Sequence, residues 1–203
     1  MKLADERVPL LVEADGERGI IRFNQPASRN SLSQEVLAAL DSAITTLTAR
    51  LDINIIIFTG TADVFASGAN LRELSELNPD QARSFSERGQ ALFQRIADAR
   101  QLTIAAINGY CMGGALDLAL ACDVRVASVN AIFAHPGAGL GIITGWGGTQ
   151  RLPRVIGRAL ASELFFTARR FSASEALQMG LVTALADPVL DYAKKIAAAT
   201  KKR

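Results

Sequence analysis

The sequence predicts a single α/β domain in which helices cover a largely parallel β-sheet. Short apolar runs, such as residues 53–58, have the composition of strands buried on both faces. They alternate with longer segments whose apolar residues recur at helical spacing. With 203 residues, of which 49% are hydrophobic, the chain is also large enough to bury a full core.

The first elements are a predicted β-hairpin and a helix. Residues 8–14 and 19–24 are rich in Val and Ile, and Asp15-Gly16 between them has the residue types of a tight turn. Ser33 is a suitable N-cap for the helix that follows. The apolar positions of this helix recur every three or four residues, at Val36, Leu37, Leu40, Ile44 and Leu47.

The middle of the chain alternates strands with helices. A loop follows the first of these strands, after Thr59-Gly60. Because strands that alternate with helices pair in parallel, we expect βαβ units here. The predicted elements are, in order, strand 53–58, helix 81–97, strand 103–107, helix 114–121 and strand 124–127.

The last third begins with a glycine-rich passage, residues 137–148. This passage is either part of a ligand site or a tight crossover between a strand and a helix. Helices are then predicted at 158–167, 173–180 and 188–199 from their apolar stripes. No linker divides the chain, so we expect one domain over residues 1–203.

Composition excludes several classes of protein. A formal net charge of +2 gives no electrostatic argument for nucleic-acid binding. No window approaches the roughly 20 apolar residues of a membrane span, and the charged first ten residues do not resemble a signal peptide. We therefore expect a cytoplasmic protein with no membrane partner. The C-terminal end is locally basic, and we interpret its charges as a solvated helix end rather than a binding patch: Lys194, Lys195, Lys201, Lys202 and Arg203.

The two cysteines, Cys111 and Cys122, have no metal-ligand spacing, and the only histidine, His135, does not complete a zinc site with them. We expect both cysteines to be reduced and buried, and we expect no metal.

Two glycine turns predict backbone donors for a bound oxygen. Gly113 and Gly114 precede the helix at 114–121, whose first amides lack partners within the helix. Ser67-Gly68 lies beyond the end of the preceding strand, where ligands bind in open α/β sheets, although it is equally an ordinary turn. If each turn supplied one N–H to the same oxygen, the pair would form an oxyanion hole. Asp117, one turn into the helix, would then lie within reach of the bound group and suggests proton transfer.

Nucleotide-binding motifs are absent from the sequence, which contains neither G-x-x-x-x-G-K-[ST] nor G-x-G-x-x-G. Instead, several segments resemble the crotonase superfamily, the enoyl-CoA hydratase/isomerase proteins. The resemblance runs from about residue 11 to 197. It rests on Arg29-Asn30-Ser31-Leu32, on Phe65-Ala66-Ser67-Gly68-Ala69-Asn70-Leu71, on Ala105-Ala106-Ile107-Asn108-Gly109-Tyr110 with Gly113-Gly114, on Gly147-Gly148-Thr149-Gln150-Arg151-Leu152-Pro153, and on residues 171–182.

The resemblance implies a crotonase-like spiral of ββα units, with a core at about 8–155 and C-terminal helices at about 156–203, a short ending for this family. It also implies an acyl-CoA thioester as substrate, no permanently bound cofactor, and homotrimers that often pair into hexamers.

The same resemblance assigns the site residue by residue. The backbone N–H groups of Ala69 and Gly114 would form the oxyanion hole that stabilises a thioester enolate. Trp146 would form a wall of the acyl pocket, although an interface or core role is equally open. Arg29 and Arg72 would meet the phosphates, unless they are only solubilising charges. The residues expected around the CoA ester are Ser28, Arg29, Ser31, Ser67, Gly68, Asn70, Leu71, Arg72, Gly113 and Gly137.

Two positions depart from the family pattern. Where family hydratases carry two glutamates, this chain has Asp117 and Gly137. Asp117 is one methylene shorter and remains the leading candidate for acid/base chemistry, whereas Gly137 offers no acid or base. Some family members with glycine at this position use a small anion such as bicarbonate, for which Gly137 would leave room. His135 is a second catalytic candidate, with a structural role as its alternative.

These residues together predict an enzyme of the enoyl-CoA hydratase/isomerase type. One alternative is an acyl-CoA hydrolase or decarboxylase of the same fold, which needs the oxyanion hole but not two glutamates. The other alternative is a non-catalytic acyl-CoA-binding protein.

Overall fold

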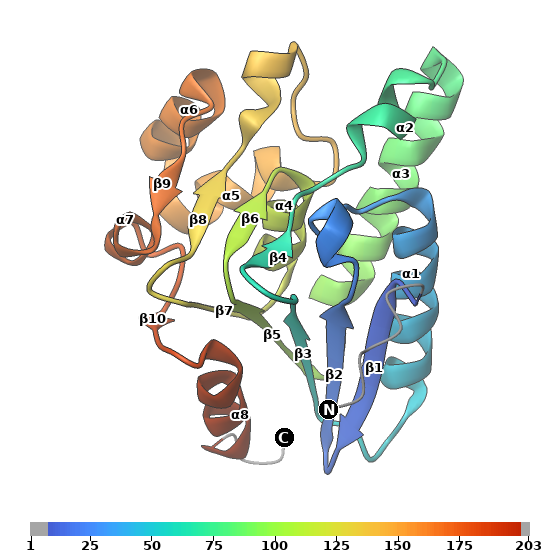
Figure 1. Ribbon diagram of the computed structural model, residues 1–203, viewed down its shortest axis with the longest axis vertical. Coiled ribbons are helices and arrows are strands. Elements are labelled where there is room, and N and C mark those ends of the chain that lie inside the picture. The colour runs from blue at the N-terminus through green and yellow to red at the C-terminus, as the bar shows by residue number, and fades with distance from the viewer. Residues whose placement is uncertain (1–7, 200–203) are drawn as a thin grey trace.

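The computed structural model describes residues 8–199, and its largest feature is a six-stranded sheet (Figure 1). The strands lie in the order β1-β2-β3-β5-β7-β10. Only β1 and β2 pair antiparallel, which confirms the predicted hairpin and the parallel arrangement after it. The strands are β1 (Leu10–Asp15), β2 (Arg18–Phe23), β3 (Ile55–Thr59), β5 (Leu102–Ile107), β7 (Val124–Ala127) and β10 (Ala184–Leu185).

A second sheet of four short strands was not predicted, and it corrects the loop expected after Thr59-Gly60. Its order is β4-β6-β8-β9. Gly60 and Gly109 lie at bends between a long strand and a short one, where an added Cβ would come within 1.9 Å and 1.7 Å of backbone oxygens. Each turn of the chain therefore gives two strands and then helix, as the resemblance implied. The strands are β4 (Val64–Ala66), β6 (Tyr110–Met112), β8 (Ile132–Ala134) and β9 (Phe171–Ser172).

The helices follow the predicted caps. The Ser33 side chain accepts a hydrogen bond from the Val36 amide, as expected. Asn78 and Gln81 form a reciprocal capping box, which starts α3 two residues earlier than the apolar pattern indicated. Helices α2 and α5 were not predicted. The helices are α1 (Gln34–Ala49), α2 (Leu71–Ser75), α3 (Pro79–Ala97), α4 (Gly114–Ala121), α5 (Gly148–Ile156), α6 (Arg158–Thr167), α7 (Ala173–Gln178) and α8 (Val189–Ala199), with 3₁₀ turns η1 (Pro26–Ser28) and η2 (Pro136–Leu140).

The six-stranded sheet is covered on both faces. Helices α1, α3 and α4 enclose the larger core, which continues between the two sheets. On the other face, Val189, Ala193 and Ala197 of α8 pack against alternate residues of β2, β3, β5 and β7. Helix α8 lies apart from the other helices at the lower left of Figure 1. The loops that follow the short strands β4, β6 and β8 border the cavity described below.

Cys111 and Cys122 are free and buried, as predicted. Lys194 forms an ion pair with Asp15 at 3.1 Å, which supports a surface role for the basic helix end. Lys195 is exposed on α8. The remaining basic residues of that end, Lys201, Lys202 and Arg203, lie outside the described residues. Among residues 8–199, no helix combines the length and apolarity needed to cross a bilayer.

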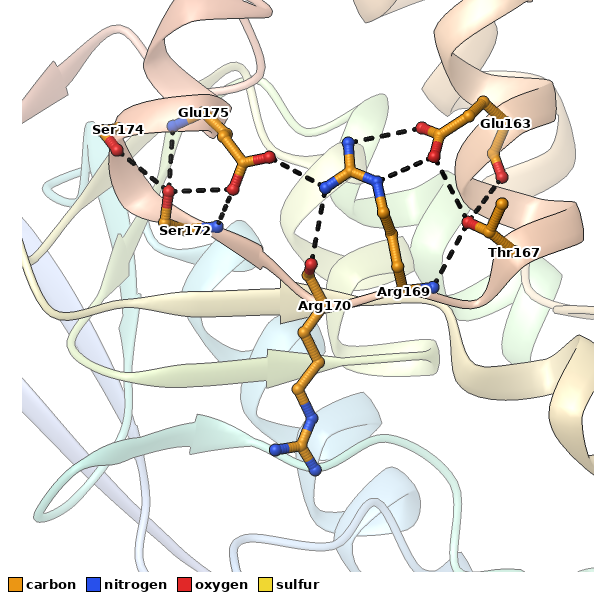
Figure 2. Close-up of polar contacts among 7 residues, drawn as sticks. All are labelled: Glu163, Thr167, Arg169, Arg170, Ser172, Ser174 and Glu175. Carbon is orange, nitrogen blue, oxygen red and sulfur yellow. Dashed lines mark hydrogen bonds and ion pairs between the residues drawn. The ribbon is translucent and has the colours of Figure 1, made fainter.

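A polar cluster joins α6 to α7 (Figure 2). The Arg169 guanidinium donates to Glu163 and to Glu175, in both cases at 2.8 Å. Glu175 also accepts from the amide and hydroxyl of Ser172 and completes the capping box of α7. This cluster fixes α6, whose inner face borders the cavity described below.

Candidate active site

A cavity of about 830 Å³ lies at the end of the second sheet. Its walls come from the turns before α2 and α4, from the loop between β8 and α5, and from one face each of α3 and α6. Most of the lining side chains are apolar, and among them are Leu74, Phe85, Ile142, Phe165 and Phe166. The volume is within the range of small-molecule sites. An extended apolar ligand portion therefore fits here.

The two predicted glycine turns meet in one wall of this cavity. Gly68 has φ of 86° and Gly113 has φ of 52°, a region that favours glycine. A Cβ on Gly68 would lie 2.6 Å from the Met112 carbonyl oxygen and 3.0 Å from the Gly114 nitrogen, so the turns are in direct contact. Within the described chain, the amides of Ala69 and Gly114 donate no hydrogen bond. Two adjacent free donors thus border the same space, and their joint binding of one oxygen stays a prediction.

Trp146 sets the position of Gly114. Its ring packs against Phe85 and Phe93 at centroid distances of 5.2 and 5.5 Å. A Cβ on Gly114 would come within 2.3 Å of this ring, and one on Gly89 of α3 within 2.2 Å. Trp146 is therefore both a core residue and a wall of the cavity, which joins two roles that the sequence left as alternatives.

Asp117 lies behind the cavity wall and is not among its lining residues. The carboxylate is fully buried. Its Oδ2 accepts from the Thr144 hydroxyl and, at 3.3 Å, from the Trp146 amide. The expectation that Asp117 stands directly beside a group bound at the glycines is corrected, because the loop at 144–148 folds over this side chain.

Burial raises the pKa of Asp117 to about 6, and the hydrogen bond from Thr144 opposes part of that rise. Close to neutral pH both the ionised and the protonated carboxyl are consequently populated, which is the property that general acid/base chemistry needs.

His135 lines the cavity and faces Asp117. Its Nε2 lies 3.6 Å from Asp117 Oδ1, and its ring lies 5.0 Å from the Phe165 ring. Only 3% of the side chain is exposed. Burial lowers the pKa of His135 to about 4, so the imidazole is neutral at pH 7. The structure thus brings the two predicted acid/base candidates together.

Gly137 also lines the cavity, but the direction of its missing side chain is filled. A Cβ there would lie 2.6 Å from the Ile142 carbonyl oxygen. The expected room for a bicarbonate ion at this position is therefore not found on that side of the glycine.

The residues predicted to surround the CoA ester fall into two groups. Ser67, Gly68, Leu71, Gly113 and Gly137 line the cavity together with Trp146. The others lie outside its lining: Ser28, Arg29, Ser31, Asn70 and Arg72.

Several members of the second group have local roles. The Ser28 hydroxyl donates to the Gln25 carbonyl. The Arg29 guanidinium lies 5.9 Å from the centroid of the Tyr110 ring. Asn70 accepts from the first amides of α2 and caps that helix. Their contact with CoA stays a prediction.

Sequence reasoning missed Thr144 and the aromatic residues of α3 and α6. Thr144 lies within the glycine-rich passage, but its partner is 27 positions away. In the apolar run Leu164-Phe165-Phe166 of α6, only Leu164 is fully buried, because Phe165 and Phe166 lie at the cavity. No group of three or more potential metal ligands occurs among residues 8–199.

The site can be compared with known proteins. A family model described as Enoyl-CoA hydratase/isomerase matches residues 16–202. The chain belongs to the enoyl-CoA hydratase/isomerase family. Curated members similar to this chain include the short-chain-enoyl-CoA hydratase of Clostridium acetobutylicum, 37% identical over 191 residues that cover 93% of this chain and 73% of that protein. A probable enoyl-CoA hydratase of Mycobacterium tuberculosis is 41% identical over 190 residues, with the same coverage.

Solved structures of this family confirm the crotonase-type fold. The enoyl-CoA hydratase of Bacillus anthracis superimposes with a TM-score of 0.90 at 35% identity, over 94% of this chain and 76% of that one. The enoyl-CoA hydratase of Thermoplasma volcanium gives a TM-score of 0.91 at 31% identity, over 96% and 78% of the two chains. The mixed α/β architecture and the hydratase/isomerase type of enzyme are therefore established for this chain.

Proposed function

We propose that this enzyme transfers a proton at the carbon next to the thioester carbonyl of an acyl-CoA, through an enolate held by the amides of Ala69 and Gly114. The observation that carries the proposal is the meeting of two free amides and one titratable pair, Asp117 and His135, around a single apolar cavity. Donors placed where negative charge develops stabilise the transition state, and one such donor contributes about 3 to 4 kcal/mol.

The reaction we favour is hydration or double-bond isomerisation of a 2-enoyl-CoA. The apolar walls at Leu74, Phe85 and Phe165 suit the acyl chain, and the glycine turns suit the thioester. The single buried carboxylate distinguishes this site from one with two catalytic acids. An acyl-CoA hydrolase or decarboxylase uses the same two amides and is the competing assignment.

An isotope experiment tests the proposal. Crotonyl-CoA and a ten-carbon 2-enoyl-CoA are incubated with the protein in D₂O, and mass spectrometry follows deuterium at the α-carbon and addition of water, while a thiol reagent follows free CoA. We expect deuterium incorporation without release of CoA. Release of CoA would instead support the hydrolase, and binding without exchange or turnover would leave only an acyl-CoA-binding protein.

Two variants at one position test the oxyanion hole. Ala69→Pro removes the amide hydrogen, whereas Ala69→Gly keeps it. We expect Ala69→Pro to lower the exchange rate by about 10² to 10³, and Ala69→Gly to stay within a few-fold of wild type. Circular dichroism verifies that each variant is folded. Equal rates in two folded variants would contradict a role for this amide.

We further propose that the protein assembles as a homotrimer, or as a pair of trimers. Exposed apolar side chains border the cavity on one loop and one helix, at Leu140, Ile143 and Phe166. Association would remove them from water. Analytical ultracentrifugation measures the mass, and a monomer at micromolar concentration would contradict the assembly.

A further inference from the structure

The Asp117–His135 pair contains three buried polar atoms without a partner in the described chain: Asp117 Oδ1 and both ring nitrogens of His135. An unsatisfied buried polar atom costs about 1 to 3 kcal/mol, so a protein retains a group of them only rarely. All three belong to side chains that are at least nine-tenths buried, and one of these side chains lines the cavity. These unsatisfied hydrogen-bonding atoms therefore indicate a functional role for the pair.

The local contacts fix which atoms face each other. Thr144 and the Trp146 amide occupy Asp117 Oδ2, and Oδ1 faces His135 Nε2 beside the backbone of Gly148. The distance of 3.6 Å between Oδ1 and Nε2 is longer than a hydrogen bond. Catalytic hydrogen bonds are often long without substrate and tighten when it binds. A small rotation of either side chain closes this contact, and Nδ1 of His135 then remains for the substrate.

Within residues 8–199, the other charged or titratable groups near the Asp117–His135 pair form no hydrogen bond or ion pair with it. On β6, burial raises the pKa of Cys111 well above its ordinary value, so this thiol is neutral. On α5, the Arg151 guanidinium attracts the Asp117 carboxylate without contacting it. From α6, the Phe165 ring lies against the imidazole at a tilt of 41°, and Arg158 lines the same cavity. No carboxylate lies among the residues that line this cavity in the described chain, so Asp117 behind its wall is the nearest one to His135.

We propose that His135 is the catalytic residue that exchanges a proton with the substrate, and that Asp117 is a positioning residue that exchanges a second proton with the other ring nitrogen. This inference rests on the proposed enolate chemistry and divides its acid/base work between two side chains.

The step balances without an imidazolium ion. Nδ1 of His135 takes the proton from the α-carbon, and the electron pair of the broken C–H bond forms the enolate. The hydrogen on Nε2 moves to Asp117 Oδ1. The negative charge thereby leaves the Asp117 carboxylate and appears on the enolate oxygen between the Ala69 and Gly114 amides, and the reverse transfer returns the proton to carbon.

Burial explains why this route is preferred to simple protonation of the imidazole. An apolar site disfavours each charged form, which lowers the pKa of His135 to about 4 and raises the pKa of Asp117 to about 6. The carboxylate consequently holds a proton more strongly than the imidazole does. A second proton arriving at the pair settles on Asp117, and the imidazole changes tautomer rather than charge.

The chain contains one histidine, so its ring can be observed without assignment. ¹⁵N NMR of histidine-labelled protein, recorded without ligand between pH 4.5 and 8, distinguishes the two neutral tautomers from imidazolium. We expect the hydrogen to move from Nε2 to Nδ1 as the pH falls through about 6, with imidazolium appearing only toward pH 4.

Four variants test the roles of the two side chains. Asp117→Asn should remove the tautomer change near pH 6, and Asp80→Asn, at an exposed carboxylate on α3, should leave it unchanged. Thr144→Val removes the hydroxyl that lowers the pKa of Asp117 and should move the midpoint upward, which provides a test if Asp117→Asn does not fold. His135→Gln should lower α-carbon exchange by about 10² to 10⁴.

The outcomes separate this inference from the proposed function. Imidazolium formation near pH 6.5, or an unchanged spectrum in folded Asp117→Asn, would overturn the proposed proton transfer between His135 and Asp117 even if α-carbon exchange occurs. A tautomer change that depends on Asp117, together with no exchange on any acyl-CoA, would support the coupling but overturn the enolate chemistry on which the catalytic assignment rests. The proposed division of roles requires both the Asp117-dependent tautomer change and α-carbon exchange.

Discussion

Two acidic clusters in this protein differ in how well their polar groups are satisfied. Around Arg169, on the surface, the guanidinium is shared by Glu163 and Glu175, and Ser172 completes the network (Figure 2). Around Asp117, inside the wall of the cavity, one carboxylate oxygen and both imidazole nitrogens have no partner in the described chain. The first cluster is exposed and paired, and the second is buried and unpaired.

This difference separates a structural role from a chemical one. The Arg169 network connects α6 to α7, and its side chains remain 37% to 40% exposed, so solvent screens its contribution. In the Asp117–His135 pair, burial shifts both pKa values and leaves proton-exchange sites open. Substitutions in the two clusters should therefore have effects of very different size.

The largest effect is expected at Gly114, whose amide is one of the two proposed oxyanion donors. Gly114→Ala places a Cβ within 2.3 Å of the Trp146 ring and must displace the start of α4. We expect a loss of about 3 to 4 kcal/mol of transition-state stabilisation, measured as kcat/KM with an enoyl-CoA. Gly139→Ala is the matched control, because no atom lies within 4 Å of its added Cβ. Similar rates for the two variants would refute the role of the Gly114 amide.

Removing the buried charge should stabilise the protein near neutral pH. The pKa of Asp117 is about 6 in the folded chain against an ordinary 3.8. The stability that its proton contributes is complete below pH 3.8 and is lost as the pH rises through about 6. The free energy of unfolding of Asp117→Asn should thus exceed that of wild type by about 3 kcal/mol at pH 7, and by less at pH 5.

Urea unfolding at the two pH values measures this difference. His135 acts in the opposite direction, since its lowered pKa contributes stability above pH 6.5 that is lost as the pH falls through about 4. Both proteins contain His135, so its effect largely cancels. A variant that is less stable than wild type at pH 7 would show that the charged carboxylate is well solvated.

Lengthening the same side chain should have a smaller, destabilising effect. Asp117 Oδ1 lies 2.0 Å from the position of a Cβ on Gly148, so Asp117→Glu forces its added methylene into the loop at 144–148. We expect a loss of about 1 to 3 kcal/mol in the free energy of unfolding, together with lower kcat. Asp80→Glu, at an exposed site, serves as control. Higher activity at unchanged stability would mean that the loop at 144–148 moves to accommodate the longer side chain without loss of stability.

The smallest effect is expected in the surface cluster. Arg169→Ala removes two exposed ion pairs, each contributing about 0 to 1 kcal/mol. We expect a slightly lower Tm and a nearly unchanged kcat. Arg170→Ala is the natural comparison, because its side chain points away from the network while its backbone carbonyl accepts from Arg169 (Figure 2). A large fall in kcat for Arg169→Ala alone would show that the position of α6 controls the cavity.

The sequence predicted the elements that carry a local signal. The long strands and the helices at Gly114–Ala121 and Arg158–Thr167 were placed at their observed bounds or within two residues. Ser33 was identified as a cap from its side-chain chemistry alone. The strands of the second sheet have only two or three residues, too few to show a period. They depend on glycine bends and on neighbours distant in the sequence, so local reasoning did not find them.

The site was predictable in part for the same reason. Gly68, Gly113 and Gly114 are turn residues with a local signature, and the structure brings them together. The enclosure of Asp117 depends on Thr144 and Trp146, which return to it across a folded loop. No spacing rule encodes such a contact. The CoA contacts of Arg29 and Arg72 remain predictions that await a ligand.

The chain contains one tryptophan, Trp146, and its ring lies against both Gly89 of α3 and Gly114 at the start of α4. Its indole ring also borders the cavity. Emission excited at the long-wavelength edge of the protein absorption, where its two tyrosines do not absorb, comes from this tryptophan alone. It should therefore change when an acyl group enters, and the signal belongs to one known place in the fold. The fluorescence of Trp146 should thus report when the cavity is occupied, which permits stopped-flow measurement of substrate entry without any attached dye.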